Sequence, residues 1–462
     1  MQVSSPSEQG VDARGIAAFL DALEGDPSIE PHGLIIQRHG RRIAEGHWAP
    51  HTGEGPRLVY SLSKTFTGTA LGLLLGEGRL SLDDLVSDHL PGLFDGASAS
   101  ARQLRVRHLA SLSTGHDRET LLEAFALDPS DPVRGFLQIP PDAAPGSLFA
   151  YNQPPVLALA TILQTLAGER LVDYLRPRVL DPIGVADLRW AQARPGLDMG
   201  FSGVHTNLDA VARLGQLYLD DGRWGGRRIL PEGWVADASA QQIDNPREPE
   251  VDWRQGYGFM LWRSRHGYRG DGAFGQFMVV LPEQDVVVAM FSCTQEMQAV
   301  LDMMWAHLLP AMTGDPSPPT VPDDELAQRL VHLTLPTVAG RRGGHAPQVT
   351  TLAFTPGRIW PSSHHSVTGI ETAAGQMVLH QGDRRLEVPL TEGWTTVDPS
   401  LATSAARLDD GRVLVDLVFL ASPHRLQVEL DPSTATFTTR WPHPPLFGGG
   451  INPQLDAMHA PA

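Results

Sequence analysis

The chain has 462 residues but only one cysteine, Cys293, and only one lysine, Lys64, among its 36 basic residues. A single cysteine excludes an intramolecular disulfide and a zinc site built from cysteines. Because Cys293 follows the strand-like run 286–292, we interpret it as a buried, inert thiol rather than a nucleophile. Arginine cannot lose its proton in a protein, whereas a lysine removed from water can. The lone lysine is therefore a candidate base.

Other absences narrow the class of protein. The sequence has no basic cluster interleaved with aromatic residues and a formal charge of −17, so nucleic acid is not an expected partner. It has no apolar run long enough to span a bilayer and no secretory signal pattern over 1–6, which predicts a cytoplasmic protein without a membrane partner. The Gly-x-Ser-x-Gly elbow of α/β-hydrolases and the Gly-Lys pair of P-loops are both missing.

Lys64 lies three residues after Ser61. If a helix begins near Ser61, positions i and i+3 share one face, so the hydroxyl and the amine can meet. The apolar run 66–75, followed by Gly76 and Gly78, predicts a buried helix with a glycine stop. Burial and the positive end of the helix dipole both disfavour the ammonium form, and a pKa lowered by about 3 units would leave many such amines neutral at pH 7. The alternative is a helix-capping serine beside a surface lysine.

The order of helical and strand-like patterns predicts two domains. Helices are expected over 11–23, 206–218 and 299–309, with a mostly helical region over about 80–180. Strands are expected over 33–38 and 42–46, which form a hairpin, and over 257–262, 276–281 and 286–291, of which the last two form another. The first domain spans 1–312, a linker spans 313–323, and strand-like runs at 386–390, 413–419 and 425–430 predict a smaller antiparallel β domain over 324–462. Pro389 would confine its strand to a sheet edge.

Two further stretches carry residues suited to chemistry. Tyr151 lies in the loop before a predicted helix over 156–166, because Pro154 and Pro155 suit a first helical turn. A phenol there can donate or accept a proton in a cleft, although it can equally anchor the helix as a half-buried aromatic. The segment 270–272 precedes the second hairpin, and its glycines permit either close approach to a ligand or a flexible turn.

Taken in order, these stretches resemble the active-site motifs of one superfamily: Ser61-Leu62-Ser63-Lys64, Tyr151-Asn152-Gln153 and Gly270-Asp271-Gly272. The superfamily is that of serine β-lactamases and penicillin-binding proteins, and the resemblance is closest to its class C-like branch of carboxylesterases, D-amino-acid peptidases and amide hydrolases. It covers roughly residues 8–312. It implies an α/β (α+β) β-lactamase-like fold, with an antiparallel sheet flanked by helices plus a helical lobe, and it implies neither a cofactor nor a metal.

The resemblance also implies roles for residues of this chain. Ser61 would be the acylated nucleophile, Lys64 its proton acceptor and Tyr151 the second acid/base. The backbone N–H groups of Ser61 and Ala273 would form the oxyanion hole, which agrees with the need of a tetrahedral intermediate for fixed donors. The expected substrate contacts are Gln153, Gly270, Asp271 and Gly272.

Two departures from the family pattern bear on the substrate. Gln153 stands where the family usually has asparagine, and Gly270 stands where it usually has lysine, histidine or tryptophan. In members that process β-lactams, that cation helps to hold the substrate carboxylate. Because Gly270 carries no positive charge, the sequence favours a neutral ester or amide as the substrate.

The leading hypothesis is a serine hydrolase that forms an acyl-enzyme on Ser61 and acts as a carboxylesterase on small neutral esters. The alternatives are an amide or D-amino-acid peptide hydrolase, or a β-lactamase-like activity. A different class is a non-catalytic protein whose cleft binds a ligand or peptide. The acyl and leaving groups, the number of subunits and the purpose of the β domain stay open.

Overall fold

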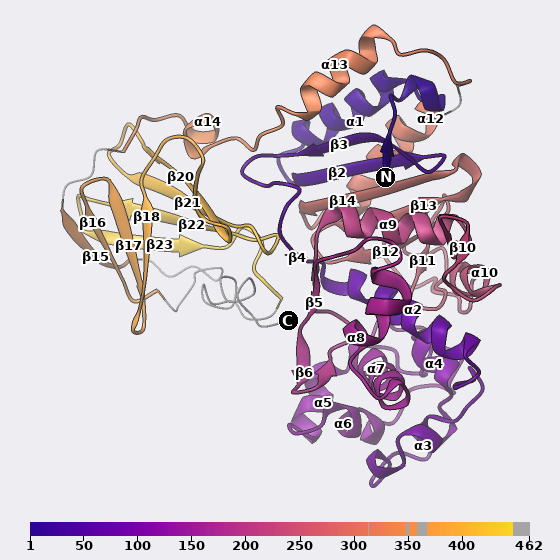
Figure 1. The fold of residues 1–462 in the computed structure, drawn as a ribbon. Helices are drawn as coiled ribbons and strands as arrows, with labels where there is room; N and C mark the ends of the chain where they lie inside the picture. Colours follow the sequence, from indigo (N-terminus) through magenta and orange to yellow (C-terminus); the bar gives the residue numbers. More distant parts are fainter. Residues whose placement is uncertain (313, 348–350, 358–366, 447–462) are drawn as a thin grey trace.

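A computed structural model describes residues 1–312, 314–347, 351–357 and 367–446. A seven-stranded sheet forms the centre of the first domain, in the order β1-β3-β2-β14-β13-β12-β11 (Figure 1). All neighbouring pairs are antiparallel except β1 and β3. The strands are β1 (Gln2–Val3), β2 (Glu30–Arg38), β3 (Arg41–His47), β11 (Trp262–Arg263), β12 (Tyr268–Gly272), β13 (Gln276–Leu281) and β14 (Val286–Cys293).

Both faces of this sheet are buried by helices. Along β2, Leu34 and Ile36 pack in one apolar cluster with α1 and α13, whereas Ile35 packs in the other cluster with α2, α9 and the lobe helix α7 (Gln153–Ala167). This alternation follows from the period of two along a strand. The covering helices are α1 (Ala13–Gly25), α2 (Ser63–Gly76), α9 (Leu208–Leu219), α10 (Trp234–Ser239), α11 (Met297–Met303), α12 (Leu309–Ala311) and α13 (Val321–Leu330).

A helical lobe extends from the α2 side of the sheet (Figure 1). Its longest helix, α7, begins at Gln153 and has both prolines in its first turn, where their missing N–H groups cost nothing. The lobe helices are α3 (Val86–His89), α4 (Val106–Ala110), α5 (Leu121–Leu127), α6 (Pro132–Gln138), α7 (Gln153–Ala167) and α8 (Leu171–Leu175). Three short strands, β4 (Arg57–Leu58), β8 (Val204–Thr206) and β5 (Leu188–Trp190), form a small sheet, and β4 leads directly into the nucleophile segment, by which we mean residues 59–65 with the predicted nucleophile Ser61.

The C-terminal domain is a nine-stranded sheet that curls on itself into a nearly closed barrel (Figure 1). Its strand order is β18-β17-β16-β15-β23-β22-β21-β20-β19, and Pro389 lies on β18, at a sheet edge as predicted. The elements are α14 (Val338–Arg342), β15 (Leu352–Pro356), β16 (Gly369–Ala373), β17 (Gln376–Gln381), β18 (Arg384–Pro389), β19 (Thr395–Asp398), β20 (Leu401–Arg407), β21 (Val413–Phe419), β22 (Arg425–Asp431) and β23 (Thr436–Arg440). The predicted fold class is therefore confirmed.

Two local predictions differ from the structure. The run 257–262 has strand composition, but only Trp262 enters a strand, because Met260 has a positive φ of 60° and bends the chain. The predicted domain start at residue 324 falls inside α13, where Leu326 and Leu330 pack with α1 rather than with the β domain.

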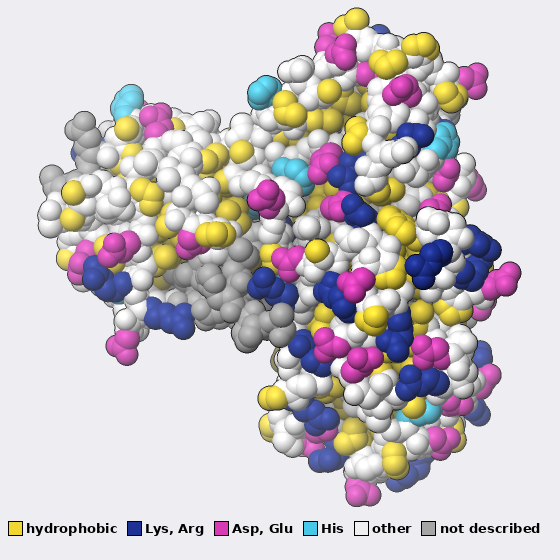
Figure 2. Space-filling model, in the orientation of Figure 1, with side chains coloured by type: hydrophobic (Ala, Val, Ile, Leu, Met, Phe, Trp, Pro, Cys, Tyr) yellow, Lys and Arg dark blue, Asp and Glu magenta, His cyan; other side chains and the backbone are white. Residues whose placement is uncertain are grey.

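Two further observations concern possible membrane-spanning helices and the distribution of charge on the surface. No single helix among the described residues is long and apolar enough to cross a membrane, and the one helix pair that passes on length and composition, α7 with Leu171–Leu180, is bent by 61°. Acidic and basic side chains are interspersed over the face in Figure 2, so the net negative charge is not concentrated there.

Candidate active site

Ser61 and Lys64 lie side by side at the start of α2. Ser61 is in the 3-10 turn η2 (Tyr60–Leu62), which runs directly into α2, and the Nζ of Lys64 lies 3.1 Å from its Oγ. The expected i, i+3 pairing is present because the 3-10 turn and the helix form one continuous spiral. Ser61 is partly exposed, whereas Lys64 is only 2% exposed. A reacting carbonyl can therefore reach the hydroxyl while the amine stays out of water.

The surroundings of Lys64 favour its neutral form. Burial lowers the pKa of Lys64 to about 7, although the carboxylates of Glu119 and Asp271 act in the opposite direction. The Nζ also contacts Gln153 Oε1 at 2.7 Å and the Phe201 carbonyl oxygen at 3.0 Å. These acceptors orient the amine so that a lone pair can face Ser61. At neutral pH a large fraction of such amines can accept a proton.

The glycines of the third motif allow β12 to approach the nucleophile segment. A Cβ on Gly270 would lie 2.2 Å from Thr65 Oγ1, and a Cβ on Gly272 would lie 2.0 Å from the carbonyl oxygen of Val59. No side chain fits at either position. Both glycines therefore contact the Val59–Thr65 stretch, and neither lines the cleft described below. Their role as substrate contacts stays a prediction.

Tyr151 lies in the loop before α7, as predicted, and its ring faces Lys64. The Lys64 Nζ is 4.6 Å from the ring centroid, and the opposite wall is Trp262, which stacks on the ring at 5.1 Å. Burial raises the pKa of Tyr151 well above its usual value, and the nearby Asp271 carboxylate raises it further, while the Ser61 hydroxyl lowers it. The phenol therefore keeps its proton at neutral pH and is able to donate it.

Gln153 links the second motif to Lys64. Its side-chain oxygen accepts the hydrogen bond from Lys64, and its backbone N–H donates to the Glu119 carboxylate at 3.1 Å. Its neighbour Asn152 points into the lobe instead, where its Oδ1 accepts from the backbone and the hydroxyl of Thr120, both at 3.0 Å. Gln153 thus reaches the amine of Lys64 with its side-chain oxygen. An asparagine side chain is one methylene shorter, so the backbone at this position would have to lie closer to Lys64 to make the same contact.

A cleft of about 620 Å³ opens in front of Ser61. Tyr151, Gln153, Asp271 and Ala273 all line it together with Ser61, so the structure brings these predicted residues together. The described residues that line the cleft include five carboxylates and no lysine, arginine or histidine. These carboxylates are Glu248, Glu250, Asp271, Glu296 and Asp302.

Asp271 is tied down by a buried arginine. Arg269 Nε donates to Asp271 Oδ2 at 2.9 Å, and both side chains are almost fully buried. Burial raises the pKa of Asp271 and the Arg269 guanidinium opposes that rise. The ion pair therefore fixes β12 directly before Ala273, whose N–H is the second expected oxyanion donor.

Three participants were missed from the sequence. Trp262 stacks on Tyr151, Glu119 holds the backbone of Gln153, and the Phe201 carbonyl accepts from Lys64. Trp262 could have been predicted, because it ends the aromatic-rich run 257–262. A backbone carbonyl has no signal in a sequence.

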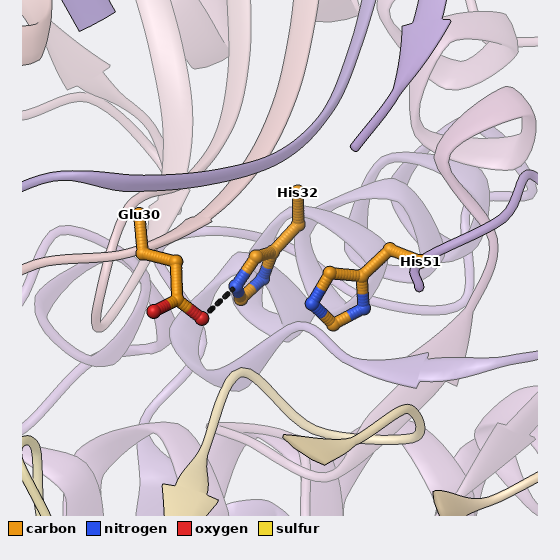
Figure 3. A group of neighbouring side chains, drawn as sticks. All are labelled: Glu30, His32 and His51. Carbon is orange, nitrogen blue, oxygen red and sulfur yellow. Dashed lines mark hydrogen bonds and ion pairs between the residues drawn. The ribbon is translucent and has the colours of Figure 1, made fainter. Parts of the chain in front are cut away.

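A second cluster of polar side chains, Glu30, His32 and His51, offers ligand atoms within 4.8 Å of one another (Figure 3). Arg57, however, donates to Nδ1 of His32 at 2.7 Å and to Nδ1 of His51 at 3.2 Å. Each ring must then carry its proton on Nε2, and in His32 that nitrogen faces Glu30 at 3.1 Å. A protonated nitrogen has no lone pair for a metal, so we interpret the cluster as a hydrogen-bond network.

A larger cavity, of about 940 Å³, lies between the two domains. Its lining includes Cys293, which is buried as predicted and whose pKa is raised well above its usual value by burial. A thiol that resists ionisation is a poor nucleophile. Ser61 and Tyr151 line the smaller cleft instead.

Comparison with known proteins identifies a family and several hydrolases that this chain resembles. Residues 16–310 match the protein family described as Beta-lactamase. The chain is 25% identical over 314 residues to 6-aminohexanoate-dimer hydrolase of Paenarthrobacter ureafaciens, covering 63% of this chain and 79% of that protein. Among solved structures, EstCE1, described as a hydrolase with promiscuous acyltransferase activity, gives a TM-score of 0.52 at 20% identity over 63% of this chain and 99% of its own.

The likeness to some solved structures extends into the C-terminal domain. The octameric penicillin-binding protein homologue from Pyrococcus abyssi gives a TM-score of 0.53 at 15% identity and covers 90% of this chain and 98% of its own. At that identity the likeness concerns the fold alone.

Proposed function

This chain belongs to the Beta-lactamase family of serine hydrolases, and from that premise we propose that it forms an acyl-enzyme on Ser61 and acts as a carboxylesterase on small neutral esters. The observation that carries the proposal is the 3.1 Å contact between a buried amine and a partly exposed hydroxyl. A nucleophile of this kind needs an adjacent base, and Lys64 is the base within reach.

The proposed reaction begins with proton transfer from Ser61 to Lys64 as Oγ bonds to the ester carbonyl carbon. The carbonyl oxygen becomes an oxyanion and accepts hydrogen bonds from the N–H groups of Ser61 and Ala273, each worth roughly 3 to 4 kcal/mol in such sites. The intermediate collapses as the bond to the leaving-group oxygen breaks. Because the Tyr151 phenol keeps its proton, it donates to that oxygen and recovers a proton from Lys64.

Deacylation reverses these roles. A water molecule loses a proton through the Tyr151 and Lys64 pair while its oxygen bonds to the acyl carbon. The bond to Ser61 Oγ then breaks, Oγ regains a proton, and a carboxylic acid leaves. The products are one alcohol and one acid for each ester and water consumed.

Charge in the cleft supports a neutral substrate. Two of its five carboxylates are paired, Asp271 with Arg269 and Asp302 with Arg265, while Glu248, Glu250 and Glu296 have no cationic partner among the described residues. An anionic β-lactam or a peptide carboxylate would enter a negative field without a counter-charge. A neutral acyl group is not repelled by these carboxylates, and it can pack against Tyr151, Trp253 and Trp262 of the same lining.

Amide hydrolysis is the second candidate within the same mechanism. The similarity to 6-aminohexanoate-dimer hydrolase supports it. Substrates of both kinds would be small molecules. A comparison of short-chain nitrophenyl esters with the matching anilides and with a β-lactam ranks the three activities directly.

A fluorophosphonate probe tests the central proposal. We expect it to label wild-type protein at Ser61 and to leave Ser61→Ala unlabelled, as shown by peptide mass spectrometry. Lys64→Arg keeps a basic side chain but one that cannot lose its proton to act as a base, so its turnover should fall by roughly 10⁴-fold or more. A folded wild-type protein that is neither labelled nor active would favour the binding-protein alternative.

A further inference from the structure

The C-terminal domain reaches the nucleophile segment through the loop 420–424 between β21 and β22. Leu58 N–H donates to the Ala421 carbonyl at 2.9 Å, and Arg57 Nη2 donates to the Ser422 carbonyl at 3.2 Å. Both donors lie within four residues of Ser61. The loop therefore runs along the backbone that leads into the nucleophile.

His424, at the end of this loop, contacts the residues that flank both expected oxyanion donors. Its Nε2 lies 2.5 Å from the hydroxyl of Tyr60, which directly precedes Ser61. Its ring packs edge to face against Phe274, which directly follows Ala273, with centroids 4.8 Å apart. Tyr60 and Phe274 also contact each other, at 5.3 Å. One imidazole thus contacts the side chains of the two residues that adjoin the expected oxyanion donors.

The hydrogen bonds of His424 fix its tautomer. Nδ1 lies 2.9 Å from the backbone carbonyl of His443, an atom that can only accept, so Nδ1 carries the proton. Nε2 is then an acceptor, and the Tyr60 hydroxyl donates to it. Burial lowers the pKa of His424 to about 3, so the ring is neutral and this arrangement holds at neutral pH.

Both flanking residues have strained backbones that need support. Tyr60 has a φ of 49° and Phe274 a φ of 67°, a region that favours glycine. Such conformations persist only when the surroundings hold them, and here the surroundings include a side chain more than 360 residues away in the sequence. Released from His424, Tyr60 would relax and rotate the N–H of Ser61.

We propose that His424 is a positioning residue, through which the C-terminal domain holds Tyr60 and Phe274 so that the N–H groups of Ser61 and Ala273 point into the cleft. The inference rests on the proposed function, because an oxyanion hole has meaning only for acyl transfer. It assigns the β domain a part in shaping the active site.

The test compares an ester with its thionoester. A thiocarbonyl sulfur fits poorly in an oxyanion hole, so losing the hole slows the oxygen ester far more than the thionoester. In His424→Leu we expect kcat for the oxygen ester to fall 10- to 100-fold, with KM within 3-fold of wild type and the thionoester rate within 3-fold. The side-chain oxygen of His424→Gln can accept a hydrogen bond from Tyr60. Its kcat for the oxygen ester should therefore be at least 5-fold higher than that of His424→Leu.

A matched control is His380→Leu, which changes a half-buried histidine on β17 of the same domain. It should leave both rates unchanged. If His424→Leu fails to fold in near-UV circular dichroism, Tyr60→Phe decides, since it removes a single oxygen and should lower the ratio of oxygen-ester to thionoester rates in the same direction.

The outcomes separate the two proposals. An active wild type whose His424→Leu and Tyr60→Phe variants keep the wild-type ratio overturns the positioning role alone. Equal losses for both esters also overturn it, because they indicate general damage. A wild type that neither hydrolyses esters nor labels at Ser61 overturns the proposed function, and this inference with it.

Discussion

Lys64 is the residue whose environment decides the chemistry. The amine is buried, its pKa is lowered to about 7, and its neutral form is the proposed base. We therefore expect log kcat/KM to rise with pH at a slope near one below about pH 7 and to level off above it. Stopped-flow assays with a neutral ester between pH 5 and 9 measure this profile. A flat profile over that range would contradict the assignment.

Burial of Lys64 also links stability to pH. Its folded pKa of about 7 is below the unfolded value of roughly 10.4, so between these values the unfolded chain binds more protons and stability rises with pH. Lys64→Met removes this dependence. The unfolding free energy of the variant minus that of the wild type should decrease by about 1.4 kcal/mol for each pH unit from about pH 7 to 10. Urea unfolding at pH 7.5, 8.5 and 9.5 checks it, and a constant difference would contradict it.

The site could be predicted from the sequence only where its residues are unusual or close together. A single lysine three residues from a serine stands out, and the expected proximity is present. His424 does not stand out, because nothing in the loop 420–424 indicates that a partner lies at Tyr60. Long-range contacts of this kind depend on how two domains meet, which local pattern does not encode.

At the scale of elements, local pattern predicted the regular segments well. The hairpins β2–β3 and β13–β14, the helices α1, α2 and α9, and strands β21 and β22 all lie where periodicity placed them. Element ends and irregular segments were predicted less well. The run 257–262 shows the reason, since a Cβ on Gly258 would lie 2.0 Å from the Ala238 carbonyl, so the chain there is shaped by a neighbour rather than by its own composition.

The close approach of β12 to the nucleophile segment makes a prediction about Gly272. Its substitution by alanine would press a Cβ against the Val59 carbonyl, which belongs to the backbone and cannot rotate away. We expect Gly272→Ala to lower the free energy of unfolding by about 1 to 3 kcal/mol and to reduce turnover. Chemical denaturation and ester assays measure both.

Gly25→Ala is the matched control, because no atom lies within 4 Å of its expected Cβ and its φ is not positive. It should leave stability within about 0.5 kcal/mol of wild type. Equal effects from the two substitutions would show that close approach at Gly272 does not matter.

For the whole molecule, α13 connects the two domains but packs with the first. Leu326 and Leu330 of α13, with Leu333 and Leu335 after it, lie in the same apolar cluster as α1. A chain that ends after Pro336 keeps these four leucines, each worth about 1.5 to 3 kcal/mol of burial. A chain that ends after Met312 loses them, so it should aggregate or unfold at a temperature lower by roughly 10 °C or more.

Calorimetry and light scattering of the two truncated chains test whether α13 and the residues up to Pro336 belong to the first domain. Similar behaviour would place the boundary near residue 312. If the β domain positions the oxyanion hole, both chains should also turn over esters more slowly than the full protein.

Charge on the cleft makes a further prediction at this scale. Five carboxylates and no basic side chain line it among the described residues. The mono-4-nitrophenyl ester of glutaric acid, which carries a carboxylate, should have a kcat/KM roughly 10-fold or more below that of 4-nitrophenyl hexanoate. The gap should narrow in 0.5 M salt, because screening weakens the repulsion. A preference for the anionic ester would overturn the neutral-substrate proposal.

The lone lysine has a practical consequence. A lysine-specific endoprotease finds one bond to cut in the printed sequence, between Lys64 and Thr65, and that bond lies inside a helix whose residues from Ser63 to Leu74 are all buried. Cleavage requires that helix to open first. The rate at which the chain splits into two fragments therefore reports how often helix α2 opens.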